Sequence, residues 1–148
     1  MITLRRFAPF LAIPLLAIPA LWPLFTVGLT ASADGMLHLM RLGLLDSHIA
    51  QGMLYPRWLP DLVLGYGYPL LNFYGPATYY VAESFHLLGL PLPQALIWTH
   101  ATFVVLAGWG MYLMALDLMP RRAGQRPWVA ALVAATAYLY GPYLLTNL

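Results

Sequence analysis

Length, composition and charge predict a membrane protein and exclude several other classes. The 148 residues are 61% hydrophobic and only 8% charged, whereas a soluble domain has roughly 25% charged residues. The basic residues are all arginine and exceed the acids by two, 7 against 5, without the basic stripe that nucleic acid binding needs. The chain has no cysteine, so disulfides, thiolate metal sites and a cysteine nucleophile are excluded.

The first predicted element is a membrane-spanning helix at residues 7–29. The apolar run is long enough to cross about 30 Å of hydrocarbon and longer than a signal-peptide core. The small residues at 31–33 favour the signal-peptide alternative. Arg5 and Arg6 predict a cytoplasmic N-terminus, so the loop at 31–76 is expected on the outer side. Four prolines, Pro9, Pro14, Pro19 and Pro23, predict that this helix is kinked. Because proline has no N–H, we also expect the carbonyls that lose their helical donors to be bonded by neighbouring helices.

A polar helix is predicted next, from about residue 35 to residue 51, capped by Ser32 or Asp34 and ended by Gly52. It is too short to span the bilayer, and its charges would be costly at the bilayer centre. We therefore expect an amphipathic helix that lies at the membrane interface. At 100° per residue, one arc of about 80° holds four polar residues, Asp34, His38, Arg41 and His48.

Three of these residues form the candidate catalytic group. Asp34 could serve as a general base or metal ligand, His38 as a second ligand and Arg41 as a phosphate clamp. Asp34 and His38 supply only two ligands, so a divalent metal ion would need further ligands from elsewhere. The alternative is an ordinary polar stripe in which Asp34 caps the helix, and spacing alone slightly favours it.

An ordered loop rich in aromatic residues, proline and glycine is expected from residue 53 to residue 76. Arg57 and Asp61 are predicted to pair and fix the loop, or else Arg57 contacts a pyrophosphate group. The aromatic side chains either bind a sugar or lipid chain or form the aromatic belt of the interface. The candidate substrate-binding residues are Arg57, Asp61, Tyr66, Tyr68 and Tyr74.

Three further spans are predicted at about 77–90, 94–118 and 128–146. Together they give an all-α, multi-pass bundle of about four spans in the cell membrane, a single membrane domain over residues 1–148 that we expect to be the N-terminal part of a longer chain. Within the second span, Glu83 and His86 are either a functional polar pair or a pair that hydrogen-bonds another helix.

The positive-inside tendency conflicts with this topology at one place. Four crossings put the linker at residues 120–127 on the outer side, although it holds Arg121, Arg122 and Arg126. Either the second or the third predicted span is re-entrant, or the whole orientation is reversed, or this short loop is an exception.

Two motifs carry a resemblance to a known group. They are A-D-G-M-L-H-L-M-R at residues 33–41 and G-M-L-Y-P-R-W-x-P-D-L-x-x-G-Y-G-Y-P-L-x-N-F-Y-G-P at residues 52–76. The chain resembles, over residues 5–148, bacterial polytopic proteins described as 6-pyruvoyl-tetrahydropterin synthase-related membrane domains. These proteins are similar in layout to GT-C glycosyltransferases.

The GT-C resemblance implies an enzyme that transfers a sugar from a polyprenyl-phosphate carrier on the outer face. By position Asp34 would be its base or metal ligand, with His38 and Arg41 in support and Arg57 on the carrier phosphate. Membrane lipids and a lipid-linked sugar donor are the expected partners. The competing hypothesis is a non-enzymatic membrane protein, either part of a transporter or a scaffold, in which Glu83 and His86 form a polar relay.

Overall fold

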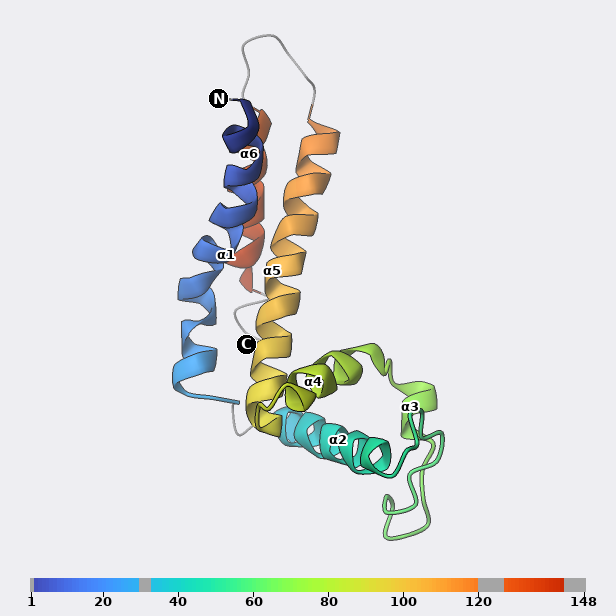
Figure 1. Ribbon diagram of the computed structural model, residues 1–148. Helices are drawn as coiled ribbons and strands as arrows, with labels where there is room; N and C mark the ends of the chain where they lie inside the picture. Colours follow the sequence, from blue (N-terminus) through green and yellow to red (C-terminus); the bar gives the residue numbers. More distant parts are fainter. Residues whose placement is uncertain (1, 30–32, 120–126, 143–148) are drawn as a thin grey trace. The chain divides into compact units, whose positions relative to one another are not determined.

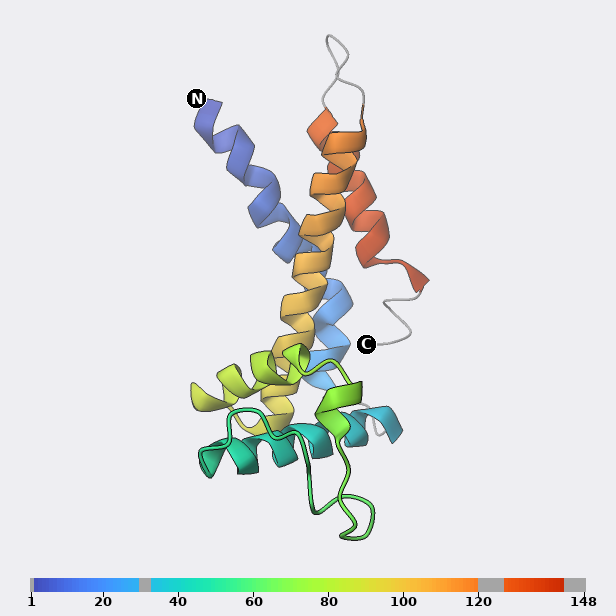
Figure 2. The same ribbon diagram turned by 90° about the vertical axis from the view of Figure 1, so that its right-hand side faces the viewer.

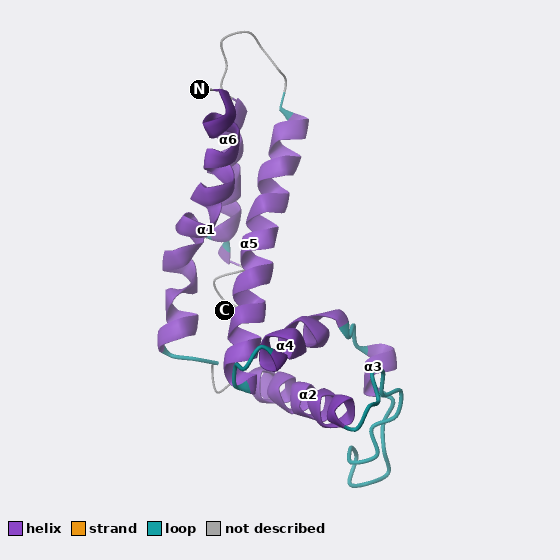
Figure 3. Ribbon diagram, viewed as in Figure 1, coloured by secondary structure: helices purple, strands orange, loops and turns teal. Residues whose placement is uncertain are grey.

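The structure is a computed structural model that describes residues 2–29, 33–119 and 127–142. In this part of the chain every regular element is an α-helix and no strand occurs (Figures 1 and 3). The all-α prediction is therefore confirmed. The helices are α1 (Ile2–Thr26), α2 (Ala33–Ala50), α3 (Leu70–Phe73), α4 (Ala77–Leu87), α5 (Leu92–Leu118) and α6 (Pro127–Leu139).

The chain divides into two compact units. The terminal unit combines Met1–Gly28 with His100–Leu148, and the central unit is Leu29–Thr99. Helix α5 contributes its first two turns to the central unit and the rest of its length to the terminal unit.

In the terminal unit, α1 and α6 run in the same direction and the later part of α5 runs antiparallel to both. The start of α1, the end of α5 and the start of α6 lie at the same end of this unit (Figures 1 and 2). The three helices meet at Gly108, where an added Cβ would lie 2.9 Å from Ile13 Cγ2 and 3.1 Å from Leu139 Cδ2. Such close backbone approach at a small residue is typical of membrane helix packing.

Helix α1 runs without interruption through its prolines, and a neighbouring helix supplies one missing donor. Pro14 has no N–H, so the Phe10 carbonyl four residues earlier loses its normal helical donor. The indole Nε1 of Trp109 in α5 donates to this carbonyl at 3.1 Å. At this position the expectation of a donor from another helix is confirmed.

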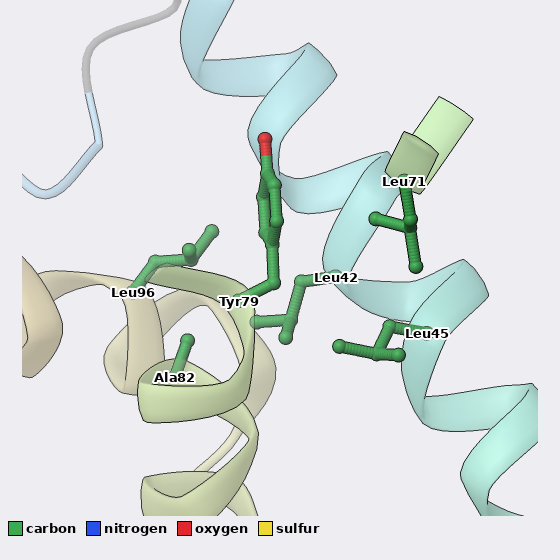
Figure 4. Close-up of a cluster of buried hydrophobic side chains, with 6 residues drawn as sticks. All are labelled: Leu42, Leu45, Leu71, Tyr79, Ala82 and Leu96. Carbon is green, nitrogen blue, oxygen red and sulfur yellow. The ribbon is translucent and has the colours of Figure 1, made fainter. Parts of the chain in front are cut away.

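The central unit is built on the packing of α4 against α2. Figure 4 shows the ring of Tyr79 standing among aliphatic side chains from α2, α3, α4 and α5, with its hydroxyl pointing away from them. All six side chains of this cluster are at most 3% exposed: Leu42, Leu45, Leu71, Tyr79, Ala82 and Leu96. Burial of this apolar surface fixes the face that each of the two helices presents to the other.

Both helices of the pair end in the same glycine motif. Gly52 follows α2 with φ +85, and its N–H bonds the Ile49 carbonyl at 2.8 Å while the Met53 N–H bonds the His48 carbonyl at 2.9 Å. Gly89 follows α4 with φ +103 and the same two-bond pattern. These are Schellman caps, which need a left-handed residue that glycine adopts without strain. Each cap stops its helix sharply.

The helices found at the predicted spans differ in length, and length decides which of them could cross a membrane. Within the described residues only α5 is both long and apolar enough to cross a membrane, and its 27 residues agree with the span predicted at 94–118. The segment predicted as a span at 77–90 is α4, whose 11 residues extend only about 16 Å. That is about half the thickness of the hydrocarbon core, so this helix does not cross the bilayer by itself.

The first and last predicted spans correspond to α1 and α6. The described apolar part of α1 is Phe10–Thr26, and α6 has 13 residues where a span was predicted at 128–146. Residues 143–148 of that prediction lie outside the described residues, as do Ser32, proposed as a helix cap, and the linker arginines.

Candidate functional site

A pocket of about 440 Å³ lies in the central unit, between α2 and the segment that joins α3 to α4. This volume is within the range of small-molecule sites. Its walls are Asp34, Leu37, His38, Arg41, Tyr74, Gly75, Thr78 and Tyr79. Four of these residues were predicted as site residues from the sequence: Asp34, His38, Arg41 and Tyr74.

Helix α2 supplies one wall because its polar residues recur at helical spacing. Asp34, His38 and Arg41 are separated by four and three residues, so they lie on one face, and the structure brings all three to the pocket. His48 does not join them, since 14 residues correspond to about 21 Å along a helix. Its ring is buried, and its Nδ1 lies 2.8 Å from the Leu44 carbonyl.

Tyr79 of α4 connects two of the predicted residues and was not predicted. Its hydroxyl oxygen accepts a hydrogen bond from Arg41 Nη1 at 3.3 Å and lies 2.8 Å from His38 Nδ1. With the oxygen accepting from arginine, the hydroxyl hydrogen is available to donate to His38 Nδ1. In that arrangement neutral His38 carries its own proton on Nε2.

Arg41 is held between two tyrosines. Its guanidinium carbon lies 4.1 Å from the centre of the Tyr74 ring, a cation–π distance. The pKa of Arg41 is raised, chiefly by the hydrogen bond to Tyr79 and against the opposing effect of burial. The side chain therefore stays a cation, and its remaining N–H groups are suited to bind a carboxylate or phosphate.

The start of α4 forms the opposite wall. Gly75 and Thr78 line the pocket, and the N-cap residue between them, Pro76, gives no side-chain hydrogen bond to the first turn. A helix N-terminus without a side-chain cap offers backbone N–H groups and a partial positive charge to an anion. Together with Arg41 it makes the pocket favourable for an anion.

Asp34 is exposed at the first turn of α2, on the rim of the same pocket. A carboxylate is favoured there by the helix dipole. Among the described residues, no group of three His, Cys, Asp or Glu side chains could hold a metal ion. Asp34 and His38 therefore do not by themselves form a metal site.

The remaining predicted substrate-binding residues are not part of the pocket lining. Arg57 and Asp61 are exposed, and the structure, which describes both, has no ion pair between them. The predicted pairing is thus not observed. Tyr66 is 82% exposed, and the backbone of Tyr68 pairs with Leu59. These residues belong to a separate hairpin that precedes α3.

A second polar group lies farther along the contact between α2 and α4. His86 of α4 has its Nδ1 2.7 Å from the Leu90 carbonyl and its Nε2 3.6 Å from Asp46 Oδ1 of α2. Glu83 is only 2% exposed, and neither carboxylate oxygen has a hydrogen-bond partner. Burial, and next the charge of Asp46, raise the pKa of Glu83, while His86 has the opposite effect. One of the two predicted alternatives was a pair that contacts another helix, and His86 does so through Asp46 of α2, whereas Glu83 has no hydrogen-bond partner.

The pocket residues come from segments that the two sequence motifs of the resemblance contain or adjoin. Comparison of the chain with protein-family models, with curated proteins and with solved structures finds no match.

Proposed function

We propose that this is an integral membrane protein in which α1 and α5 cross the bilayer while α2, α3 and α4 lie on the outer surface. The short α4 supports this topology, because it removes one crossing from the four that the sequence predicts. Arg5 and Arg6 then lie on the same side as the linker that follows α5. Five of the seven arginines are cytoplasmic, in agreement with the positive-inside tendency.

In this topology α6 re-enters the membrane from the cytoplasmic side. Its 13 residues cover about 20 Å, so a full crossing needs residues that follow it. Labelling with a thiol reagent that does not cross membranes tests the orientation. Gln51→Cys is expected to react in intact cells, and Gly124→Cys only after lysis. The reverse pattern would refute the proposed orientation.

We further propose that the pocket binds the phosphate group of a polyprenyl-phosphate sugar and that the protein transfers this sugar, as the GT-C resemblance implies. One observation carries the proposal: Arg41 and the α4 N-terminus, which has no side-chain cap, line a single pocket whose rim holds a carboxylate. The cationic groups suit the phosphate, and the carboxylate suits a base.

The chemical step assigns one role to each group. The Asp34 carboxylate takes the proton from an acceptor hydroxyl while the hydroxyl oxygen forms a bond to the anomeric carbon of the sugar. The bond between this carbon and the carrier phosphate oxygen breaks, and its electron pair remains on the phosphate. Arg41 pairs with the negative charge that develops there. Tyr79 acts as a positioning residue, since it holds both His38 and Arg41.

Binding of undecaprenyl phosphate to the protein in nanodiscs tests the phosphate site, with the neutral alcohol undecaprenol as the comparison ligand. Arg41→Gln is expected to weaken binding of the phosphate by about tenfold or more, because a charge-assisted contact is lost. It should leave binding of the alcohol unchanged. Arg57→Gln, an exposed arginine outside the pocket, is the matched control and should bind as the wild type does.

Consumption of a polyprenyl-phosphate hexose tests the reaction. Asp34→Asn should bind the carrier but not consume the sugar donor, whereas Asp61→Asn, an exposed acid outside the pocket, should retain activity. Equal consumption by Asp34→Asn and wild type would show that Asp34 is not the base. Equal affinity of the wild type for the phosphate and the alcohol would show that the pocket is not a phosphate site and would favour a non-enzymatic role.

A further inference from the structure

The contact between α2 and α4 holds a buried acid that the proposed chemistry does not use. Glu83 is only 2% exposed, and neither of its carboxylate oxygens has a hydrogen-bond partner among the residues that the structure describes. The other two polar side chains that the structure shows as buried, His48 and Thr99, each lie within hydrogen-bond distance of a backbone carbonyl. Glu83 is therefore the exception, and an unpartnered buried polar group calls for a physical explanation.

Glu83 lies on the side of α4 that packs against α2. Tyr79, four residues earlier on the same helical face, and Ala82, its direct neighbour, stand in one cluster with Leu42 and Leu45 of α2 (Figure 4). The acid is thus one helical turn beyond the Tyr79 ring, and we call the packing of α4 on α2 around these residues the junction. In the described part of the chain α2 is the main helix partner of α4, so the junction is what chiefly keeps α4 in place.

The charges that act on Glu83 come from both helices of the junction. Burial raises the pKa of Glu83 most, the charge of Asp46 in α2 raises it further, and His86 in α4 has the opposite effect. His86 is placed against Asp46, with its Nε2 3.6 Å from Oδ1, and makes no hydrogen bond to Glu83. The other helical segments that pack here, α3 and residues Leu92–Thr99 of α5, have no titratable side chain.

The two protonation states of Glu83 differ in how well they fit this packing. The protonated acid is neutral, so its burial costs no more than that of another uncharged polar group. The carboxylate would be a buried charge without a partner, near the like charge of Asp46, which is far more costly. It regains its hydration only if the junction opens. The packed junction therefore favours the proton, and it becomes less stable as the pH rises from the ordinary carboxyl pKa through the raised folded-state pKa of Glu83.

Both ends of α4 permit such an opening. Gly75 precedes the N-cap residue Pro76, and Gly89 follows the helix with φ +103. An added Cβ at either glycine would have no atom within 4 Å, so neither position is packed against other atoms. Movements of helices turn about a few residues at the ends of elements, often small ones. The two glycines give α4 such residues at each end.

We propose that the proton on Glu83 is a switch for the junction: while Glu83 is protonated α4 stays packed on α2, and loss of the proton separates the two helices. The pocket depends on the same contact, because the Tyr79 hydroxyl accepts a hydrogen bond from Arg41 at 3.3 Å and lies 2.8 Å from His38 Nδ1. Separation removes this hydroxyl from both partners. The switch thus assembles the pocket at acidic pH and takes it apart at higher pH. Its effect on ligand binding rests on the proposed function, whereas the opening of the junction does not.

Modification of a thiol placed inside the junction measures its opening. The chain has no cysteine, and Ala82 is 0% exposed in the cluster, so Ala82→Cys gives one small buried thiol. Its rate of reaction with a charged methanethiosulfonate reagent is followed from acidic to alkaline pH in the full protein in nanodiscs. The reference is Ala82→Cys combined with Glu83→Gln, which has the shape of the protonated acid and does not titrate. Ionisation of the thiol itself is common to both proteins and cancels in the ratio of their rates.

Opening of the junction with release of one proton predicts how this ratio depends on pH. The rate of Ala82→Cys divided by that of the reference is expected to rise about tenfold for each unit of pH between the ordinary carboxyl pKa and the folded-state pKa of Glu83, and then to level off. Gln51→Cys, at an exposed position of the same unit, is the control and should react equally fast with and without Glu83→Gln. A ratio for Ala82→Cys that stays constant over the whole range would overturn the proposal.

Two further variants keep Glu83 and so test the proposal even if Glu83→Gln fails to fold. Both are made with Ala82→Cys, and their rates are divided by that of Gln51→Cys at each pH. Asp46→Asn removes a charge that raises the pKa of Glu83, so the rise should level off at a lower pH. His86→Gln removes the opposite effect and should move the plateau to a higher pH. Shifts in the same direction, or no shift in either variant, would contradict the assignment of the proton to Glu83.

Binding of undecaprenyl phosphate tests the consequence for the pocket. The affinity of the wild type, divided by that of Glu83→Gln, should fall severalfold as the pH rises, because Tyr79 no longer holds Arg41 in place. Ionisation of the ligand phosphate is common to both proteins and cancels in this ratio. A constant ratio of affinities beside a rising thiol rate would show that the junction opens without taking the pocket apart, which would refute that part of the proposal. Absence of binding to both proteins at every pH would refute the proposed function and leave the thiol result as the test of the switch.

Discussion

Substitution of Gly108 by alanine tests how α1 and α6 pack on α5. The new methyl group would lie 2.9 Å from Ile13 Cγ2 and 3.1 Å from Leu139 Cδ2, and both of these side chains are fully buried. Overpacking of this kind costs about 1–3 kcal/mol, while alanine in place of glycine gains about 0.8–1.0 kcal/mol of helix propensity. We expect Gly108→Ala to lower the free energy of unfolding by up to about 2 kcal/mol.

Gly110→Ala is the matched control in the same helix. An added Cβ at Gly110 has no atom within 4 Å, so only the propensity gain of about 0.8–1.0 kcal/mol is expected. The propensity terms cancel in the difference between the two variants, which leaves the steric cost of about 1–3 kcal/mol. Unfolding by dodecyl sulfate in mixed micelles, followed by circular dichroism, measures both. Free energies that agree within about 0.5 kcal/mol would refute the three-helix contact at Gly108.

Two further predictions concern the central unit. The pKa of Glu83 in the folded protein is raised above its ordinary value of 4.5, so the native state holds this proton more tightly than the unfolded state does. The stability of the protein therefore falls as the pH rises from the unfolded-state pKa of Glu83 through its folded-state pKa. Glutamine does not titrate, so the unfolding temperature of Glu83→Gln should fall less than that of the wild type between acidic and neutral pH. A Glu83→Gln variant that is less stable than the wild type at every pH would contradict this reasoning. In the hairpin, Gly67→Ala should displace the Trp58 ring, because the new Cβ would lie 2.3 Å from the indole Nε1. Gly65→Ala is the control, since Gly65 has the same left-handed backbone conformation but no atom within 4 Å of an added Cβ. In protein labelled with 5-fluorotryptophan, one of the five tryptophan signals should shift in the fluorine NMR spectrum of Gly67→Ala and none in that of Gly65→Ala; equal spectra would show that the ring is not seated on Gly67.

Local sequence patterns predicted the elements whose cause is local. The polar helix expected at 35–51 is α2 at Ala33–Ala50, and the span expected at 94–118 is α5 at Leu92–Leu118. Helical spacing also placed Asp34, His38 and Arg41 on one face, and the structure brings them to one pocket. Periodicity and glycine caps are contained in short stretches of sequence, so they could be interpreted without knowledge of the fold.

What the sequence did not predict depends on contacts between segments that are far apart in the chain. The span predicted at 77–90 is not confirmed, and in α4 the side chains of Tyr79 and Ala82 pack in one cluster with Leu42 and Leu45 of α2. Hydropathy alone does not distinguish burial in protein from burial in lipid. Tyr79 was missed as a site residue for the same reason, since its partners His38 and Arg41 are 41 and 38 residues away in the sequence.

The hydrogen bond from Trp109 to the Phe10 carbonyl bears on how the protein is made. The donor and acceptor are 99 residues apart, so α1 leaves the ribosome long before the residue that completes its backbone pairing exists. In hydrocarbon an unpaired carbonyl costs several kcal/mol. In the proposed topology, in which α1 and α5 cross the bilayer, the Phe10 carbonyl therefore gains this donor only when α5 is placed beside α1. In that topology the backbone pairing of α1 is complete only once Trp109 of α5 has been made.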